Sequence, residues 1–192
     1  MTEEKKYWEP DIETMPLDEL RKLQEERLRK IVAHAYEKTK LYRQKFDEAG
    51  VKPGDIKTLD DLPKLPLTEY LKDFCQTPLE DKMAVPMNEV KQVCSTSGTI
   101  SGFTQPVLFT EEDFRDNCIM AMARARWAIG ERPGDVIQSL LPINCPLIAL
   151  RALGVGVLLE QAGRGNLDNQ IKLAKIMGVT VLEQIPSLVL SY

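Results

Sequence analysis

Histidine and cysteine are scarce in this chain, and their scarcity excludes several kinds of site. The 192 residues contain one histidine, His34, so a metal cluster built on several histidines is excluded. His34 lies in a helical pattern, which favours a packed or surface side chain over a general base. No C-x-x-C spacing occurs, which indicates reduced thiols and neither a zinc site nor a disulfide framework. The cysteines are Cys75, Cys94, Cys118 and Cys145.

Long apolar runs and an excess of basic residues are also missing. No apolar run approaches the roughly 18 residues that indicate a membrane span. The net charge is −4 and the pI is about 5.2, which argues against a nucleic-acid partner. No apolar stretch follows the polar first residues, so we expect no secretory signal and a cytoplasmic location. A hydrophobic content of 43% can supply a core for one domain of this length.

The residue pattern changes near residue 88, from helical periodicity and prolines to alternating strand and helix patterns. This change predicts a helical segment over 1–88 and an α/β nucleotide-binding subdomain over 89–192. Apolar residues recur near the helical period from Pro16 to Gly50, with a break expected near Thr39. Prolines punctuate residues 51–87, which predicts a linking region with short helices over 58–62 and 68–74 and no second core.

Strand patterns alternate with helical ones in the second half. Between the later strands we expect a helix after Thr110, with Phe114, Cys118, Met122 and Ile129 on its buried face, and another capped by Asn166 and ended by Gly178. This alternation predicts an α/β fold with a partly parallel sheet, flanking helices and one antiparallel hairpin. The expected strands are residues 90–94, 105–109, 135–140, 155–159 and 179–184.

A run of small hydroxyl residues between the first two expected strands suits a loop that wraps an anion. Residues 94–104 contain six serine or threonine residues and two glycines. Glycine permits positive φ and lets successive N–H groups point inward, while hydroxyl groups add donors. The run is no Walker A sequence, because three residues separate Gly98 from Gly102 and no lysine follows. A flexible Ser/Thr/Gly linker remains the alternative, although the flanking strands favour an ordered hairpin loop.

Several segments together resemble the phenylacetate–CoA ligase branch of the acyl-adenylate-forming ligases. The run Ser95-Thr96-Ser97-Gly98-Thr99, followed by Gly102, is similar to the family's S/T-S-G-T-T-G phosphate loop. Further similar segments occur in the family's order along nearly the whole chain. They are residues 41–56, 58–62, 65–68, 132–136, 163–166 and 178–187.

The resemblance implies the N-terminal portion of an ATP-dependent carboxylate–CoA ligase. Such enzymes form an acyl-adenylate from ATP and a small carboxylic acid and then a CoA thioester, so ATP, Mg²⁺ and CoA are the implied cofactors. The catalytic residues and the metal ligands of the family are expected downstream of residue 192, and dimers occur in the family, so a homodimer is a further expectation. The implied phosphate contacts are Thr96, Ser97, Gly98, Thr99, Ser101 and Gly102.

Two departures from the family pattern affect the prediction. Phe103 stands where the family loop has a lysine, which puts ATP use in question. Residues 143–148 replace a glycine- and aromatic-rich stretch, so the sequence does not indicate an aromatic acid. The alternative function is a non-catalytic binding module that kept the fold.

Other candidate residues have ordinary structural interpretations. Residues 163–166 follow a strand and precede a helix, where ligand loops occur, but a capped connection is favoured. Arg124 and Arg126 are interpreted as solvated helix residues rather than contacts to CoA phosphates. Trp127 is expected to pack in the core, and Trp8 to anchor the N-terminus.

Overall fold

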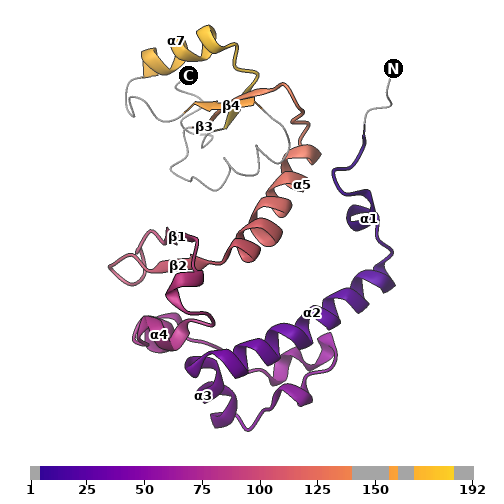
Figure 1. The fold of residues 1–192 in the computed structure, drawn as a ribbon, viewed down its shortest axis with the longest axis vertical. Coiled ribbons are helices and arrows are strands. Elements are labelled where there is room, and N and C mark those ends of the chain that lie inside the picture. The colour runs from indigo at the N-terminus through magenta and orange to yellow at the C-terminus, as the bar shows by residue number, and fades with distance from the viewer. Residues whose placement is uncertain (1–4, 140–155, 160–166, 184–192) are drawn as a thin grey trace. The chain divides into compact units, whose positions relative to one another are not determined.

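A computed structural model describes residues 5–139, 156–159 and 167–183 of the 192 (Figure 1). The chain forms two compact units. We call Thr14–Glu111 the helical unit, and Met1–Glu13 with Glu112–Tyr192 the sheet unit. The predicted division at residue 88 is based on sequence patterns and stays a prediction. In the structure, residues 89–111 belong to the helical unit. In the described part, no helix has the length and apolar character needed to cross a membrane.

The helical unit begins with two helices joined at a threonine. Helix α2 spans Leu17–Lys38 and α3 spans Lys40–Glu48. Between them Thr39 is extended, and its hydroxyl oxygen accepts a hydrogen bond from the Tyr42 N–H at 3.3 Å. The same hydroxyl donates to the Ala35 carbonyl at 2.8 Å, so one side chain ends α2 and caps α3. The break expected near Thr39 is thus confirmed.

Residues 51–89 contain short helical turns and also complete a hydrophobic core. The buried side chain of Ile56 packs with Val32 of α2 and Phe46 of α3. The linking region thus adds Ile56 to the core of α2 and α3, which the sequence did not indicate because proline spacing describes the backbone and not which side chains are buried. The turns are η1 (Pro53–Asp55), η2 (Leu59–Lys64), η3 (Tyr70–Phe74), α4 (Leu79–Lys82) and η4 (Met87–Glu89).

A two-stranded antiparallel hairpin closes the helical unit. Strand β1 (Gln92–Ser95) pairs with β2 (Pro106–Phe109), in a register that places Gln92 opposite Phe109 and Ser95 opposite Pro106. The hairpin expected around the hydroxyl-rich run is confirmed. Its ten-residue connection, residues 96–105, is the candidate phosphate loop.

The sheet unit contains a three-stranded parallel sheet with β3 in the centre, in the order β4-β3-β5. The α/β fold class is confirmed, and a strand overlaps each of the five expected ranges, although the expected end residues 140, 155 and 184 lie outside the described part. The cap expected at Asn166 lies outside the described residues. The elements are α1 (Pro10–Glu13), η5 (Asp113–Ile119), α5 (Met120–Ala128), β3 (Val136–Ser139), β4 (Gly156–Leu159), α7 (Leu167–Met177) and β5 (Val181–Glu183).

The core of the sheet unit lies between α5 and β3. Ala123, Trp127 and Ile137 are buried together, and Trp8 packs against Trp127 with ring centroids 5.5 Å apart. This confirms the expected roles of both tryptophans.

The buried face of α5 differs from the expected one. Phe114 is buried as expected, but Ile129 is exposed and Ala123 and Trp127 are buried instead. The preceding segment η5 is π-helical. A π-helical turn adds about one residue to the period, so it rotates the following helix relative to a plain 3.6-residue pattern.

Candidate functional site

The candidate phosphate loop is pinned at its mouth by one threonine and one glutamine. The Thr96 N–H donates to the Gln105 carbonyl at 3.0 Å, and the Gln105 N–H donates to Thr96 Oγ1 at 3.0 Å. Gln105 is buried although it lies in a loop. The ends of the loop are therefore fixed to each other beyond the last pair of the strand ladder.

Two glycines shape the interior of the loop. Gly98 and Gly102 both have φ of +75°, and the Gly102 N–H donates to the Gly98 carbonyl at 2.9 Å. A Cβ atom on Gly98 would lie 2.7 Å from the carbonyl carbon of Phe103, whereas one on Gly102 would meet nothing within 4 Å. Positive φ favours glycine at both positions, and close backbone approach demands it at Gly98.

The loop presents several backbone donors in a row. Within the part of the chain that the structure describes, the N–H groups of residues 97–101 donate to no protein acceptor. The hydroxyls of Ser97 and Thr99 lie 2.9 Å apart and share one hydrogen bond, and Ser101 Oγ donates to the Phe103 carbonyl at 2.5 Å. Successive backbone N–H groups without a protein acceptor are typical of loops that bind anions.

The predicted contact residues divide into two groups in this geometry. Thr96 and Gly102 use their amides to close the loop, whereas Ser97, Gly98, Thr99 and Ser101 keep theirs available. All six residues lie within the one loop between β1 and β2. Contact with phosphate by any of them remains a prediction.

No cation belongs to the loop itself. Residues 92–109 carry no charged side chain, and the ammonium group of Lys91 donates to the Asn88 carbonyl at 3.2 Å. Ile100 and Phe103 are 72% and 56% exposed, so apolar side chains project from the loop instead. The groups of the loop itself that can bind an anion are therefore amides and hydroxyls.

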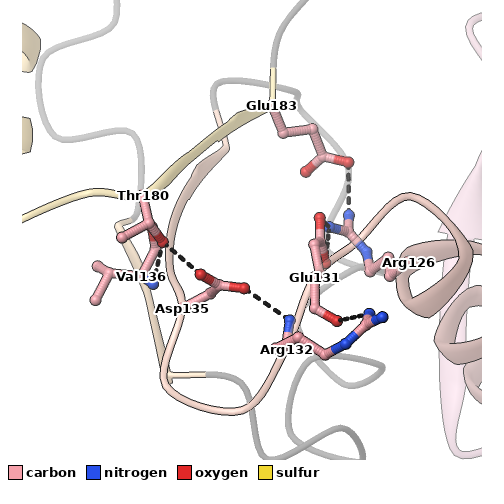
Figure 2. Close-up of polar contacts among 7 residues, drawn as sticks. All are labelled: Arg126, Glu131, Arg132, Asp135, Val136, Thr180 and Glu183. Carbon is pink, nitrogen blue, oxygen red and sulfur yellow. Dashed lines mark hydrogen bonds and ion pairs between the residues drawn. The ribbon is translucent and has the colours of Figure 1, made fainter. Parts of the chain in front are cut away.

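The sheet unit contains a charged cluster that the sequence interpretation missed (Figure 2). Arg126 is only 4% exposed, so its interpretation as a solvated residue is wrong. Its Nη1 donates to both carboxylate oxygens of Glu131, at 2.9 and 3.2 Å, and its Nη2 donates to Glu183 Oε1 at 2.6 Å. We call Arg126, Glu131 and Glu183 the arginine network.

Burial decides the electrostatics of this network. Glu131 is 3% exposed, and this desolvation raises the pKa of its carboxyl even though Arg126 acts in the opposite direction. The sequence contains little indication of this network, because Glu183 lies 57 residues beyond Arg126.

A chain of hydrogen bonds around Asp135 joins the turn after α5 to the sheet (Figure 2). Asp135 Oδ2 accepts from the Arg132 N–H at 2.7 Å, and its Oδ1 accepts from the Thr180 hydroxyl at 2.9 Å. The Thr180 oxygen in turn accepts from the Val136 N–H at 3.0 Å. These contacts fix the start of β3 relative to the start of β5.

The remaining candidates carry no site chemistry in the described residues. His34 is exposed, and Arg124 pairs with Glu9. The Trp127 ring N–H donates to the Lys5 carbonyl at 2.9 Å. Residues 163–166 and 143–148 lie outside the described part.

The described residues do not assemble a metal site of their own. They include no group of three or more His, Cys, Asp or Glu side chains that could hold an ion. Mg²⁺ is usually bound through one or two carboxylates together with substrate phosphates. The donor set of the loop therefore fits Mg²⁺ only as an ion that arrives on the phosphates.

Comparison with known proteins gives a consistent result. No family model matches the chain. Phenylacetate-coenzyme A ligase of Thermus thermophilus is 40% identical over 134 residues, which is 69% of this chain. The Escherichia coli enzyme of the same name is 42% identical over 127 residues, or 66% of this chain.

The chain belongs to the phenylacetate–CoA ligase branch of the acyl-adenylate-forming ligases. It spans 28–29% of the length of the curated relatives it matches and corresponds to an N-terminal portion of these ligases. The predicted family is confirmed.

Solved ligase structures match the fold over the whole chain. An open conformation of 2-hydroxyisobutyryl-CoA ligase, in complex with 2-HIB-AMP and CoA, has a TM-score of 0.83 at 25% identity and covers all of this chain. The same ligase in the thioesterification state also has a TM-score of 0.83, at 26% identity. This chain covers 46% and 42% of those two structures.

Proposed function

We propose that the loop between β1 and β2 binds the β- and γ-phosphates of ATP, in an AMP-forming carboxylate–CoA ligase whose N-terminal portion this chain represents. The observation that carries the proposal is the row of N–H groups over residues 97–101, which have no acceptor in the described part. A loop pinned at Thr96 and Gln105 holds those donors in place before the ligand arrives.

The proposed reaction has two transfers. A carboxylate oxygen of the acid attacks the α-phosphorus of ATP, the bond to the bridging oxygen breaks, and pyrophosphate leaves. The CoA thiol then loses its proton and attacks the acyl carbon, and AMP leaves. The loop would act in the first transfer, by donating hydrogen bonds to the departing phosphates and keeping the α-phosphate in line with the acid.

Because the loop carries no charge, its amides and hydroxyls would have to make the phosphate contacts. Amides of residues 97–101 and the hydroxyls of Ser97 and Thr99 would satisfy the phosphate oxygens, since no charged side chain lies between residues 92 and 109. Mg²⁺ carried on the triphosphate would supply the positive charge. The acid is a small carboxylic acid of unassigned structure, and we place the reaction in the cytoplasm.

One observation favours the second candidate, a non-catalytic binding module with the same fold. The exposed Phe103, in place of the family lysine, removes a cation from the loop. Such a module would bind a phosphorylated ligand without transferring an acyl group.

Two experiments separate these functions. Isothermal titration with Mg·ATP, comparing the native sequence with Gly98→Ala, tests the loop, and we expect at least about a tenfold weaker affinity in the variant. Carboxylate-dependent exchange of pyrophosphate into ATP by the complete ligase tests adenylation. Absence of exchange with every carboxylate tried, despite tight nucleotide binding, would exclude the ligase and leave the binding module.

A further inference from the structure

The arginine network joins three separate parts of the sheet unit. Arg126 lies in the last turn of α5, Glu131 in the turn that follows, and Glu183 is the last residue of β5. Arg126 donates to Glu131 through Nη1 and to Glu183 through Nη2, so one guanidinium holds the turn and the strand end at once (Figure 2). Only the planar fork of arginine can make both contacts in this geometry.

Glu183 lies at the carboxyl edge of the sheet. In the register of β3 and β5, Ser139 pairs with Glu183, so the carboxyl ends of the two strands are neighbours. Open α/β sheets bind their ligands outside this edge.

Two polar atoms at that edge are buried and unsatisfied. Ser139 Oγ and Glu183 Oε2 have no hydrogen-bond partner within the described residues. Buried polar groups are nearly always paired, and exceptions call for a functional or solvent-related explanation. Arg126 therefore binds Oε1 of Glu183 at this edge, whereas Glu183 Oε2 and Ser139 Oγ are polar atoms without a partner in the described residues.

We propose that Arg126 is a positioning residue for ligand binding: it fixes the carboxyl edge of β5 through Glu183, and Glu131 modulates that hold by sharing the guanidinium. The inference rests on the proposed function, because the ligand is the acid or nucleotide of the ligase. Arg126 itself contacts no reacting group in this proposal.

Because Arg126 contacts both Glu131 and Glu183, we expect its stabilisation of β5 to depend on pH. With both carboxyl groups ionised, the network has one positive and two negative charges; with Glu131 protonated it is neutral, and repulsion between Glu131 and Glu183 disappears. The charged groups next to Glu131 are Arg126 of α5, Glu183 of β5, and Arg132 and Asp135 of the turn, where Arg132 Nη1 donates to the Glu131 carbonyl at 2.9 Å. Burial raises the pKa of the Glu131 carboxyl. Lower pH should therefore tighten the hold on β5.

Protons can reach the network from solvent. A pocket of about 370 Å³ borders it, lined by the three network residues and by apolar side chains that include Met122 and Ile129. The Glu183 side chain is 23% exposed. Equilibration with bulk pH thus requires no unfolding.

The test compares Arg126→Lys with Arg124→Lys, the same replacement two residues away in α5, where Arg124 pairs with Glu9. Hydrogen exchange of the β5 amides in this chain measures the hold directly, and we expect protection to fall about tenfold in Arg126→Lys and by less than about twofold in the control. In the complete ligase, the KM for the acid or for ATP in pyrophosphate exchange should rise by about tenfold with a smaller change in kcat.

The role of Glu131 is tested by pH. As pH rises from the ordinary glutamate pKa through the raised pKa of Glu131, β5 protection factors should fall in the native chain and stay level in Glu131→Gln. If Arg126→Lys does not fold, the neutral set Arg126→Met, Glu131→Gln and Glu183→Gln replaces it, because removing all three charges leaves no buried ion unpaired. That set should fold and still lose β5 protection.

The outcomes separate this inference from the proposed function. Unchanged β5 protection in Arg126→Lys overturns the inference, and so does lost protection with an unchanged KM. Absence of pyrophosphate exchange by the native ligase overturns the proposed function. Hydrogen exchange of the β5 amides then still decides whether Arg126 fixes the strand.

Discussion

The candidate phosphate loop and the arginine network use polar groups in opposite ways. The loop has exposed apolar side chains, no charge and a row of N–H groups without protein acceptors in the described part. The network is charged, with Arg126 and Glu131 buried and Glu183 partly exposed, and its arginine has two carboxylate partners. Unpaired donors near solvent are suited to a ligand, whereas paired charges in the interior are suited to holding elements together.

The largest expected effect is on the network. Arg126→Met leaves the buried carboxylate of Glu131 without its cation and also removes the partner of the partly exposed Glu183, which should lower the free energy of unfolding by about 3–5 kcal/mol. Urea denaturation followed by circular dichroism measures the loss. Arg124→Met removes a partly exposed pair and should lose only about 0–1 kcal/mol. An equal loss of unfolding free energy in the two variants would show that the buried position of Arg126 does not make its ion pairs more important for stability than the partly exposed pair of Arg124.

A smaller effect is expected in the loop, where two glycines form a matched pair. Gly98 and Gly102 share a φ of +75°, but only at Gly98 would a Cβ meet backbone, at 2.7 Å. Alanine at Gly102 should cost about 1–2 kcal/mol of conformational strain. Alanine at Gly98 should cost about 1–3 kcal/mol beyond that, because the loop must open.

Thermal or urea unfolding measures the stability difference between these two alanine variants, and Mg·ATP titration measures the consequence for binding. Gly102→Ala serves as the control for left-handed strain alone. If the two variants were equally stable and bound equally well, close packing at Gly98 would not shape the loop.

The smallest effect concerns the pH dependence of the network. Because burial raises the pKa of Glu131 in the folded chain, the folded state binds an extra proton between the unfolded and the folded pKa. The stability that this proton contributes is present below the ordinary glutamate pKa and is lost as pH rises through the folded one. Glu131→Gln should remove this slope, which urea midpoints measured over the acidic range would detect. A steeper slope in the variant would contradict the raised pKa.

Local features of the fold were accessible from the sequence. The hydroxyl that ends α2 and caps α3 belongs to Thr39, where the helical pattern was expected to break. The hairpin was expected from two apolar runs flanking a glycine- and hydroxyl-rich loop, and the loop then formed with Gly98 and Gly102 in the left-handed region. Each of these depends on residues that lie close together in the sequence.

Features that depend on distant partners were missed. The sequence pattern around Arg126 is that of a solvated helix residue, and its burial and its contact with the distant Glu183 show otherwise. Ile56 lies among prolines, yet it completes a core with Val32 and Phe46. The π-helical segment η5 rotates α5 so that Trp127 and Ala123, and not Ile129, are buried.

The sequence by itself determined the class of fold, the family and the position of the hairpin loop that is the candidate phosphate loop, because turn chemistry, periodicity and short motifs depend on consecutive residues. The tertiary structure decided which donors in that loop are free and which charged side chains are buried. Those properties depend on hydrogen-bond partners and on exclusion of water, and both arise only when residues far apart in the chain pack against each other.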